Sequence, residues 1–100
     1  MIEIHRNDEG ALLGFDVVVR EGKTETRHRV TMAKASFERL AASARMAAKP
    51  CTPEAVIEAA FRFLLDREPK ESILARFDVS VIARYFPEFE QALPRYLPSP

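Results

Sequence analysis

The sequence predicts an α+β fold, in which an N-terminal two- or three-stranded antiparallel sheet is followed by three to four helices packed on one face. Two observations carry this prediction. Apolar and polar residues alternate in the first third of the chain, as in half-buried strands, and later apolar residues recur every three or four positions, as on helices. Its 100 residues, 47% of them hydrophobic, suffice for one core. We therefore expect a single domain over residues 1–97 and an irregular tail over 98–100.

The strongest strand pattern is a β-hairpin over about residues 13–32. Gly22-Lys23 fits a two-residue loop with glycine at its first central position, as a type II′ turn requires. This loop fixes the register, and the resulting pairs are Leu13 with Met32, Phe15 with Val30, Val17 with His28, Asp16 with Arg29 and Arg20 with Glu25. The first three pairs make one face mostly apolar, whereas the last two set opposite charges beside each other on the other face. A slip by one residue would turn every side chain over, so this agreement specifies the register.

A shorter alternation at the start of the chain, with Ile2 and Ile4 separated by a polar residue, indicates a further strand. The pattern leaves open whether this Ile2-Ile4 segment joins the sheet. If the far edge beside residues 24–32 stays free, two copies of the chain can pair there. We therefore expect either a monomer or a strand-mediated homodimer.

Two helices are predicted after the hairpin. The first is modestly amphipathic, includes Phe37 and Leu40, and is expected to end at Lys49-Pro50, because proline pushes the preceding residue out of the helical region. The second begins at Thr52, a good N-cap that is followed directly by proline and glutamate. Apolar residues surround most of its circumference, which places it at the centre of the domain.

The last third of the chain is predicted to form short helices. Pro69 is placed to begin one of them, and Asp78 is placed to cap another over residues 79–86. The residues expected to point inward from these two helices are Ile73, Leu74, Phe77, Val81, Ile82, Tyr85 and Phe86. Pro87 ends the second helix and opens a final short turn.

Composition excludes several classes of protein. Fifteen basic residues balance fifteen acidic ones, which argues against a strongly basic nucleic-acid binder and against a polybasic membrane anchor. No apolar run approaches the roughly 20 residues of a membrane span. Cys51 is the only cysteine, so neither an internal disulfide nor a thiolate metal cage can form. We expect a cytoplasmic protein without membrane association, cofactor or metal.

Few residues offer catalytic chemistry. His28 is expected on the inward face of the hairpin, where a lone histidine is more often a hydrogen-bonded core residue than a catalyst. Cys51 precedes the N-cap Thr52, where the helix dipole could lower a thiol pKa, but the sequence names no base beside it. Glycine-rich phosphate loops and spaced metal ligands are also missing. We therefore expect that the protein is not an enzyme.

Charged residues at the end of the central helix have a structural interpretation. Arg67 and Glu68 lie where that helix is expected to stop at Pro69. We expect them to form a buried or half-buried ion-pair network with Arg76 or Arg84. Such a network would lock the corner between two helices.

The segment FRFLLDREPKESILARFDVSVIARYFPEFE, residues 61–90, resembles a family of small uncharacterised bacterial proteins. In that family a β-hairpin precedes a helix ending in Leu-Leu-x-Arg-Glu-Pro, and Ser-Ile-Leu, Phe-Asp and Tyr-Phe-Pro-Glu follow. The resemblance implies the same order of elements and a bacterial, cytoplasmic origin, and it supplies no catalytic residue. The leading interpretation is a non-enzymatic interaction or accessory module with a protein partner still to be identified.

Residues 27–67 also resemble a ribbon-helix-helix repressor, since the strand RHRVTM is followed by two predicted helices. The resemblance implies that two chains pair their strands and that Arg27, Arg29 and Thr31 contact DNA. Two features oppose it: the strand already has a partner within its own chain, and two carboxylates share the arginine face. DNA affinity depends mainly on phosphate neutralisation, and the formal net charge is zero. A DNA-binding regulator is therefore the alternative function, and nucleic acid the less favoured partner.

Overall fold

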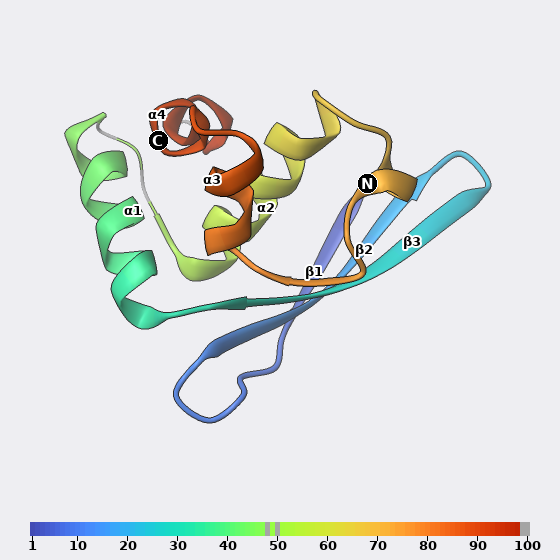
Figure 1. Ribbon diagram of the computed structural model, residues 1–100, viewed down its shortest axis with the longest axis horizontal. Coiled ribbons are helices and arrows are strands. Elements are labelled where there is room, and N and C mark those ends of the chain that lie inside the picture. The colour runs from blue at the N-terminus through green and yellow to red at the C-terminus, as the bar shows by residue number, and fades with distance from the viewer. Residues whose placement is uncertain (48, 50, 99–100) are drawn as a thin grey trace.

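A four-stranded sheet forms one layer of the molecule and the helices form the other (Figure 1). The computed structural model describes residues 1–47, 49 and 51–98. The strands are β1 (Ile2–Arg6), β2 (Leu13–Glu21), β3 (Thr24–Met32) and β4 (Arg76–Asp78). The helices are α1 (Lys34–Met46), α2 (Pro53–Leu65), α3 (Ser80–Tyr85) and α4 (Phe89–Ala92), with short 3₁₀ turns η1 (Lys70–Ser72) and η2 (Leu93–Tyr96). This arrangement confirms the predicted α+β class.

The hairpin of β2 and β3 has the predicted register. Val17 lies opposite His28 and Asp16 lies opposite Arg29. Gly22 has a φ of 60°, a conformation that glycine adopts at little cost. The Ile2-Ile4 segment does join the sheet, because β1 pairs antiparallel with β2 and sets Ile4 opposite Val17.

A fourth strand occupies the other edge of β3, where the sequence predicts a helix. Strand β4 runs parallel to β3, with Phe77 opposite Val30. The Arg29 amide donates to the Ala75 carbonyl at 2.7 Å, and the Val79 amide donates to the Thr31 carbonyl at 2.9 Å. Buried backbone groups need such partners, and β4 with its flanking residues supplies them for residues 29–31 of β3. The predicted helix with Ile73 and Phe77 on its buried side is therefore wrong, although both residues are buried.

Pairing with β4 removes part of the free edge that is expected beside residues 24–32, because β4 pairs with β3 only over residues 29–31. Over its last residues β3 has a neighbour on each side, because the strand order in the sheet is β1-β2-β3-β4. A homodimer paired along this edge would therefore be confined to residues 24–28 of β3. Among the described residues, the other free edges belong to β1 and β4.

Helix ends follow the local sequence signals in two cases. The Thr52 hydroxyl oxygen accepts a hydrogen bond from the Ala55 amide at 3.1 Å, and proline follows at the first helical position, as predicted for α2. Asp78 Oδ1 accepts from the Ser80 amide at 3.0 Å at the start of α3, although the N-cap is Val79 rather than the predicted Asp78. In contrast, α1 ends at Met46, before the predicted end, and Pro50 lies outside the described residues.

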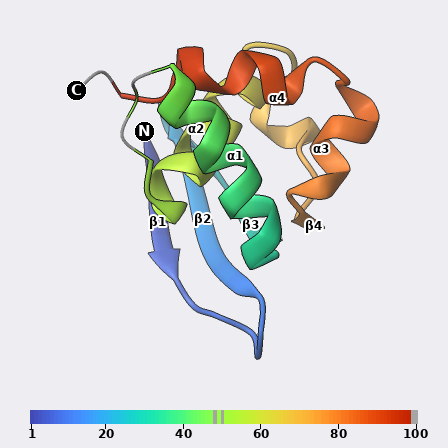
Figure 2. The same cartoon turned by 90° about the vertical axis from the view of Figure 1, so that its left-hand side faces the viewer.

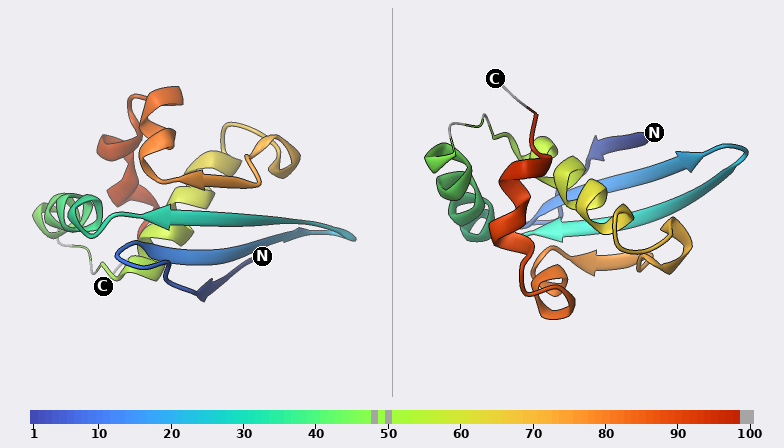
Figure 3. Two further views of the ribbon diagram at one scale, coloured as in Figure 1. Left: turned by 60° about the horizontal axis from the view of Figure 1, so that its bottom comes forward. Right: turned by 90° about the horizontal axis from the view of Figure 1, so that it is seen from above.

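Helix α2 is the centre of the packing. It crosses one face of the sheet, while none of the helices in the described ranges lies on the opposite face (Figure 3). Its Phe61 and Phe63 side chains are fully buried. Helix α1 lies beyond the end of β3, and α4 and η2 pack above α2 (Figure 2). In the described part of the chain, each helix is too short or too polar to cross a membrane.

Candidate functional site

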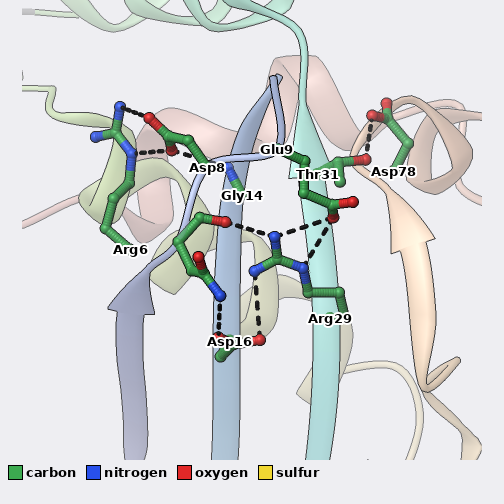
Figure 4. A network of polar contacts seen from close by, with 9 residues as sticks. Arg6, Asp8, Glu9, Gly14, Asp16, Arg29, Thr31 and Asp78 are labelled. Carbon is green, nitrogen blue, oxygen red and sulfur yellow. Dashed lines mark hydrogen bonds and ion pairs between the residues drawn. The ribbon is translucent and has the colours of Figure 1, made fainter. Parts of the chain in front are cut away.

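The open face of the sheet carries the arginines that the ribbon-helix-helix resemblance singles out. Arg29 extends from β3 across β2, and its side chain is only 14% exposed. Its guanidinium donates to Glu9 Oε2 at 3.0 Å, to Asp16 Oδ1 at 3.3 Å and to the Asn7 carbonyl oxygen (Figure 4). The predicted pairing with Asp16 is therefore present. Arg29 therefore links β3 to the β1–β2 loop. Its guanidinium already has two carboxylates and a backbone carbonyl as partners within the chain.

That loop is held by a second set of polar contacts. Asp8 Oδ1 accepts from Arg6 Nε at 2.6 Å and from the Gly14 amide at 3.1 Å (Figure 4). The hydrogen bond from Arg6, and then that from the Gly14 amide, lower the pKa of the Asp8 carboxyl below its usual value. Asn7 Nδ2 also donates to Asp16 Oδ2 at 3.3 Å. Around the β1–β2 loop, the open face therefore carries internally matched charges.

The other two residues of the proposed DNA-contacting set are also engaged within the chain. Arg27 is 73% exposed and pairs with Glu25 at 2.9 Å. The Thr31 hydroxyl donates to Asp78 Oδ2 at 2.7 Å, and β3 has both neighbouring strands at this point (Figure 4). Strand pairing between two chains, which the ribbon-helix-helix resemblance implies, has no open edge along residues 29–31.

Arg67 has other partners than the sequence analysis expects. Its guanidinium carbon lies 3.6 Å from the centroid of the Phe63 ring, and Nε lies 3.3 Å from Glu88 Oε2. Its Nη1 donates to the Phe63 carbonyl at 3.2 Å. Within the described residues, no ion pair joins Arg67 to Glu68, and none involves Arg76 or Arg84. The predicted network is therefore replaced by one that fastens the C-terminal segment to α2.

His28 is buried, as expected for a core histidine. Its Nδ1 lies 2.7 Å from the Leu74 carbonyl oxygen, and its Nε2 lies 2.8 Å from Thr26 Oγ1. A carbonyl oxygen only accepts, so Nδ1 carries the proton, and in the neutral ring Nε2 accepts from the threonine hydroxyl. The ring also packs against Phe61, with centroids 5.3 Å apart. Both nitrogens are thus used to join β3 to the segment that leads into β4.

A buried lysine that sequence reasoning did not place in the core fastens η1 to the tip of the hairpin. Lys70 Nζ donates to Thr24 Oγ1 and to Glu71 Oε2, each at 2.6 Å. The hydrogen bond from Lys70 lowers the pKa of the Glu71 carboxyl. Local sequence offers no signal for this contact, because Thr24 lies 46 residues away.

Cys51 has no activating environment. Burial raises the pKa of its thiol, the effect opposite to the lowering that a helix N-terminus can produce, and Arg45 only partly opposes it. In the described ranges, no three histidine, cysteine or carboxylate side chains cluster closely enough to hold a metal ion.

An apolar groove lies above β4 and is the second candidate surface. Its volume is about 300 Å³, and its walls come from the end of α2, the segment before β4, β4 itself and α3. The lining residues are Leu64, Glu68, Ser72, Ile73, Leu74, Phe77, Ile82, Tyr85 and Phe86. Aliphatic and aromatic side chains dominate this set, with one carboxylate and one aliphatic hydroxyl among them. Such a lining suits recognition of an apolar side chain.

Two side chains of the groove are exposed against expectation. Sequence reasoning places Leu74 and Tyr85 inward, but they are 51% and 70% exposed. In the part of the chain that the structure describes, the large exposed apolar side chains are Met1, Leu12, Met46, Leu74 and Tyr85. The groove thus brings together two of the chain's exposed apolar residues. The groove could have been predicted from the many apolar residues over 73–86. A three-residue strand and a short helix cannot bury all of their side chains.

Comparison with known proteins does not identify a family for the chain. No family model matches the chain, and no curated protein or solved structure matches it.

Proposed function

We propose that the protein is a non-enzymatic interaction module that binds a segment of a partner protein in the groove between β4 and α3. The observation that carries this proposal is the exposure of Leu74 and Tyr85 at an apolar groove of about 300 Å³. Exposed apolar surface that is gathered at a concave site is typical of binding sites. Scattered exposed residues, such as Met46 on α1, need no such explanation.

The chemistry of the lining favours one large apolar side chain as the anchor of the partner. Phe77, Ile82 and Phe86 supply apolar walls for it. Burying a leucine or phenylalanine side chain contributes about 1.5–3 kcal/mol. Glu68 forms no ion pair with another described residue, so its carboxylate is available to an amide or a cation of the partner.

The resemblance to small bacterial proteins supports the same surface. Its motif positions in residues 61–90 include every lining residue of the groove except Ile82. Core packing would explain the motif at Phe77, but it does not explain Leu74, Tyr85 or Glu68. From this resemblance we also infer a bacterial, cytoplasmic setting.

Selection of peptides tests the proposal without knowledge of the natural partner. Random dodecapeptides displayed on phage are selected on the immobilised protein, and the enriched sequences are synthesised with a fluorescent label. Their affinities are then measured by fluorescence polarisation for the wild type, Leu74→Glu and Tyr85→Glu. We expect enriched peptides with a shared apolar anchor and at least tenfold weaker binding by both variants.

The matched control is Met46→Glu, which removes an exposed apolar side chain from α1, outside the groove. We expect this variant to bind as the wild type does. Circular dichroism melting establishes that all three variants are folded. Failure to enrich any peptide, or enriched peptides that bind the groove variants as well as the control, would overturn the proposal.

A further inference from the structure

The outer edge of β4 lies at the end of the sheet. Strand β4 has β3 as its neighbour on one side and no strand of the described residues on the other (Figure 3). Its ladder with β3 uses the Ala75 carbonyl and the Val79 amide. In a parallel pair, alternate residues direct their backbone groups to the same neighbour. The amide and carbonyl groups of Arg76 and Asp78 therefore point away from β3, along the free edge.

The groove opens beside this edge. Phe77 of β4 lies on the helix-covered side of the sheet and lines the groove, together with Leu74 before the strand and Tyr85 on α3. Successive side chains of a strand point to opposite faces. A strand added along β4 would therefore place alternate side chains on the groove side and the others on the open face of the sheet.

The charges on the open face favour added strands with a particular side chain at that face. Arg76 lies opposite Arg29 in the register and shares that face. Arg29 is saturated by Glu9 and Asp16, whereas Arg76 has no ion pair with any residue in the described part of the chain. The carboxylate of Asp78, the other open-face residue of β4, already accepts from Thr31 and from the Ser80 amide. An added strand with an acidic side chain beside Arg76 would therefore supply the missing counter-charge.

We infer that the partner segment binds as an extended strand added to the outer edge of β4, with an acidic residue beside Arg76 and apolar residues on either side of it facing the groove. This inference rests on the proposed function and specifies the class of partner as an apolar–acidic–apolar segment. Backbone hydrogen bonds supply affinity in such complexes, and pockets for alternate side chains supply specificity.

Strand β1 of a second copy is not the occupant, although its Ile2-Glu3-Ile4 has the same pattern. The two isoleucines already pack against the core, and Glu3 pairs with Arg20 at 2.8 Å. Strand β1 therefore has no side chain left for the groove of another molecule.

Backbone methylation of the tightest selected peptide tests the inference. Methyl groups are placed on one backbone nitrogen at a time along its anchor region. An added strand directs every second amide to β4, so we expect methylation to weaken binding at least tenfold at alternate positions and to have little effect at those between. Arg76→Glu should weaken binding of the acidic peptide at least threefold, and a lysine in place of the acidic residue should restore it. Arg95→Glu, an exposed position on η2, is the charge-matched control and should leave binding unchanged.

The outcomes separate the inference from the proposal on which it rests. Peptides that lose binding with Leu74→Glu but tolerate methylation at every position, and do not respond to Arg76→Glu, would overturn strand addition and leave the groove as the binding site. A selection without enriched peptides would overturn the proposed function, and the inference with it. Light scattering that shows self-association of the wild type, abolished by Arg76→Glu, would show that a second copy is the occupant and would also overturn the inference.

Discussion

Arg29 reaches the Asn7 carbonyl by passing over Gly14 of the neighbouring strand, where a side chain would block it. A Cβ at residue 14 would overlap the Asn7 carbonyl oxygen and lie 2.5 Å from Arg29 Nη2. The glycine is required here for close approach rather than for a turn. It allows the guanidinium to join β3 to the β1–β2 loop (Figure 4).

Alanine at position 14 is therefore expected to destabilise the protein. The added methyl group must displace either the loop backbone or the guanidinium, and overpacking of this kind costs about 1–3 kcal/mol of unfolding free energy. Urea denaturation followed by circular dichroism measures the change. Ser36→Ala, at a half-buried position on α1, is the control and should shift the midpoint far less. An unchanged midpoint for Gly14→Ala would show that Arg29 does not depend on the missing side chain.

Replacement of Arg67 by alanine is expected to lower the melting temperature. The change removes the stacking on Phe63 and the contacts with Glu88 and Tyr96, so the C-terminal segment is held less firmly on α2. Lysine should not restore stability, because an ammonium lacks the planar group that stacks on the ring. Thermal melting compares these variants with Arg84→Ala, an exposed arginine without an ion pair among the described residues. Equal melting temperatures for Arg67→Ala and Arg84→Ala would contradict this account.

Acid should weaken the β1–β2 loop through Asp8. The pKa of this carboxyl is lowered in the folded protein, chiefly by the hydrogen bond from Arg6. The ionised group therefore stabilises the fold above the ordinary aspartate pKa, and this contribution is lost as the pH falls through the lower, folded value. Asp8→Asn should thus melt at a lower temperature than the wild type at pH 7, and the difference should shrink towards pH 2. A difference that stays constant over this range would contradict the assignment.

Cys51 is expected to react slowly with alkylating reagents. Burial raises the pKa of its thiol, and the thiolate is the reactive form. Iodoacetamide labelling of the folded protein at pH 7 should be slower than that of free cysteine, and unfolding in urea should accelerate it. Mass spectrometry measures the labelled fraction over time. Labelling at the rate of free cysteine would contradict the raised pKa and the shielding of the thiol by burial.

The elements that could be predicted from the sequence are those with local signals. Gly22 and two opposite-charge pairs specify the register of the hairpin, and Thr52-Pro53 specifies the start of α2. In both cases the local secondary-structure propensity agrees with the pattern of burial. Tertiary contacts therefore favour the same structure as the local sequence does.

The parts that could not be predicted depend on contacts between distant residues. Strand β4 is three residues long and is held by β3, as in the Thr31–Asp78 contact across 47 positions. Arg67 meets Glu88 and Tyr96, which lie 21 and 29 positions away, rather than its expected neighbours. The groove exists because β4 replaces a helix turn and leaves Leu74 exposed. Periodicity alone carries no information about such pairings.

Chemical-shift mapping tests the central claim, that the groove above β4 is the binding surface, most directly. The ¹⁵N-labelled protein is titrated with the tightest selected peptide, and amide shifts are followed by two-dimensional NMR. We expect saturable changes that centre on Leu74, Phe77 and Tyr85, with Arg27 and Arg29 little affected. Changes centred on those two arginines would instead identify the open face of the sheet as the binding surface and contradict the account.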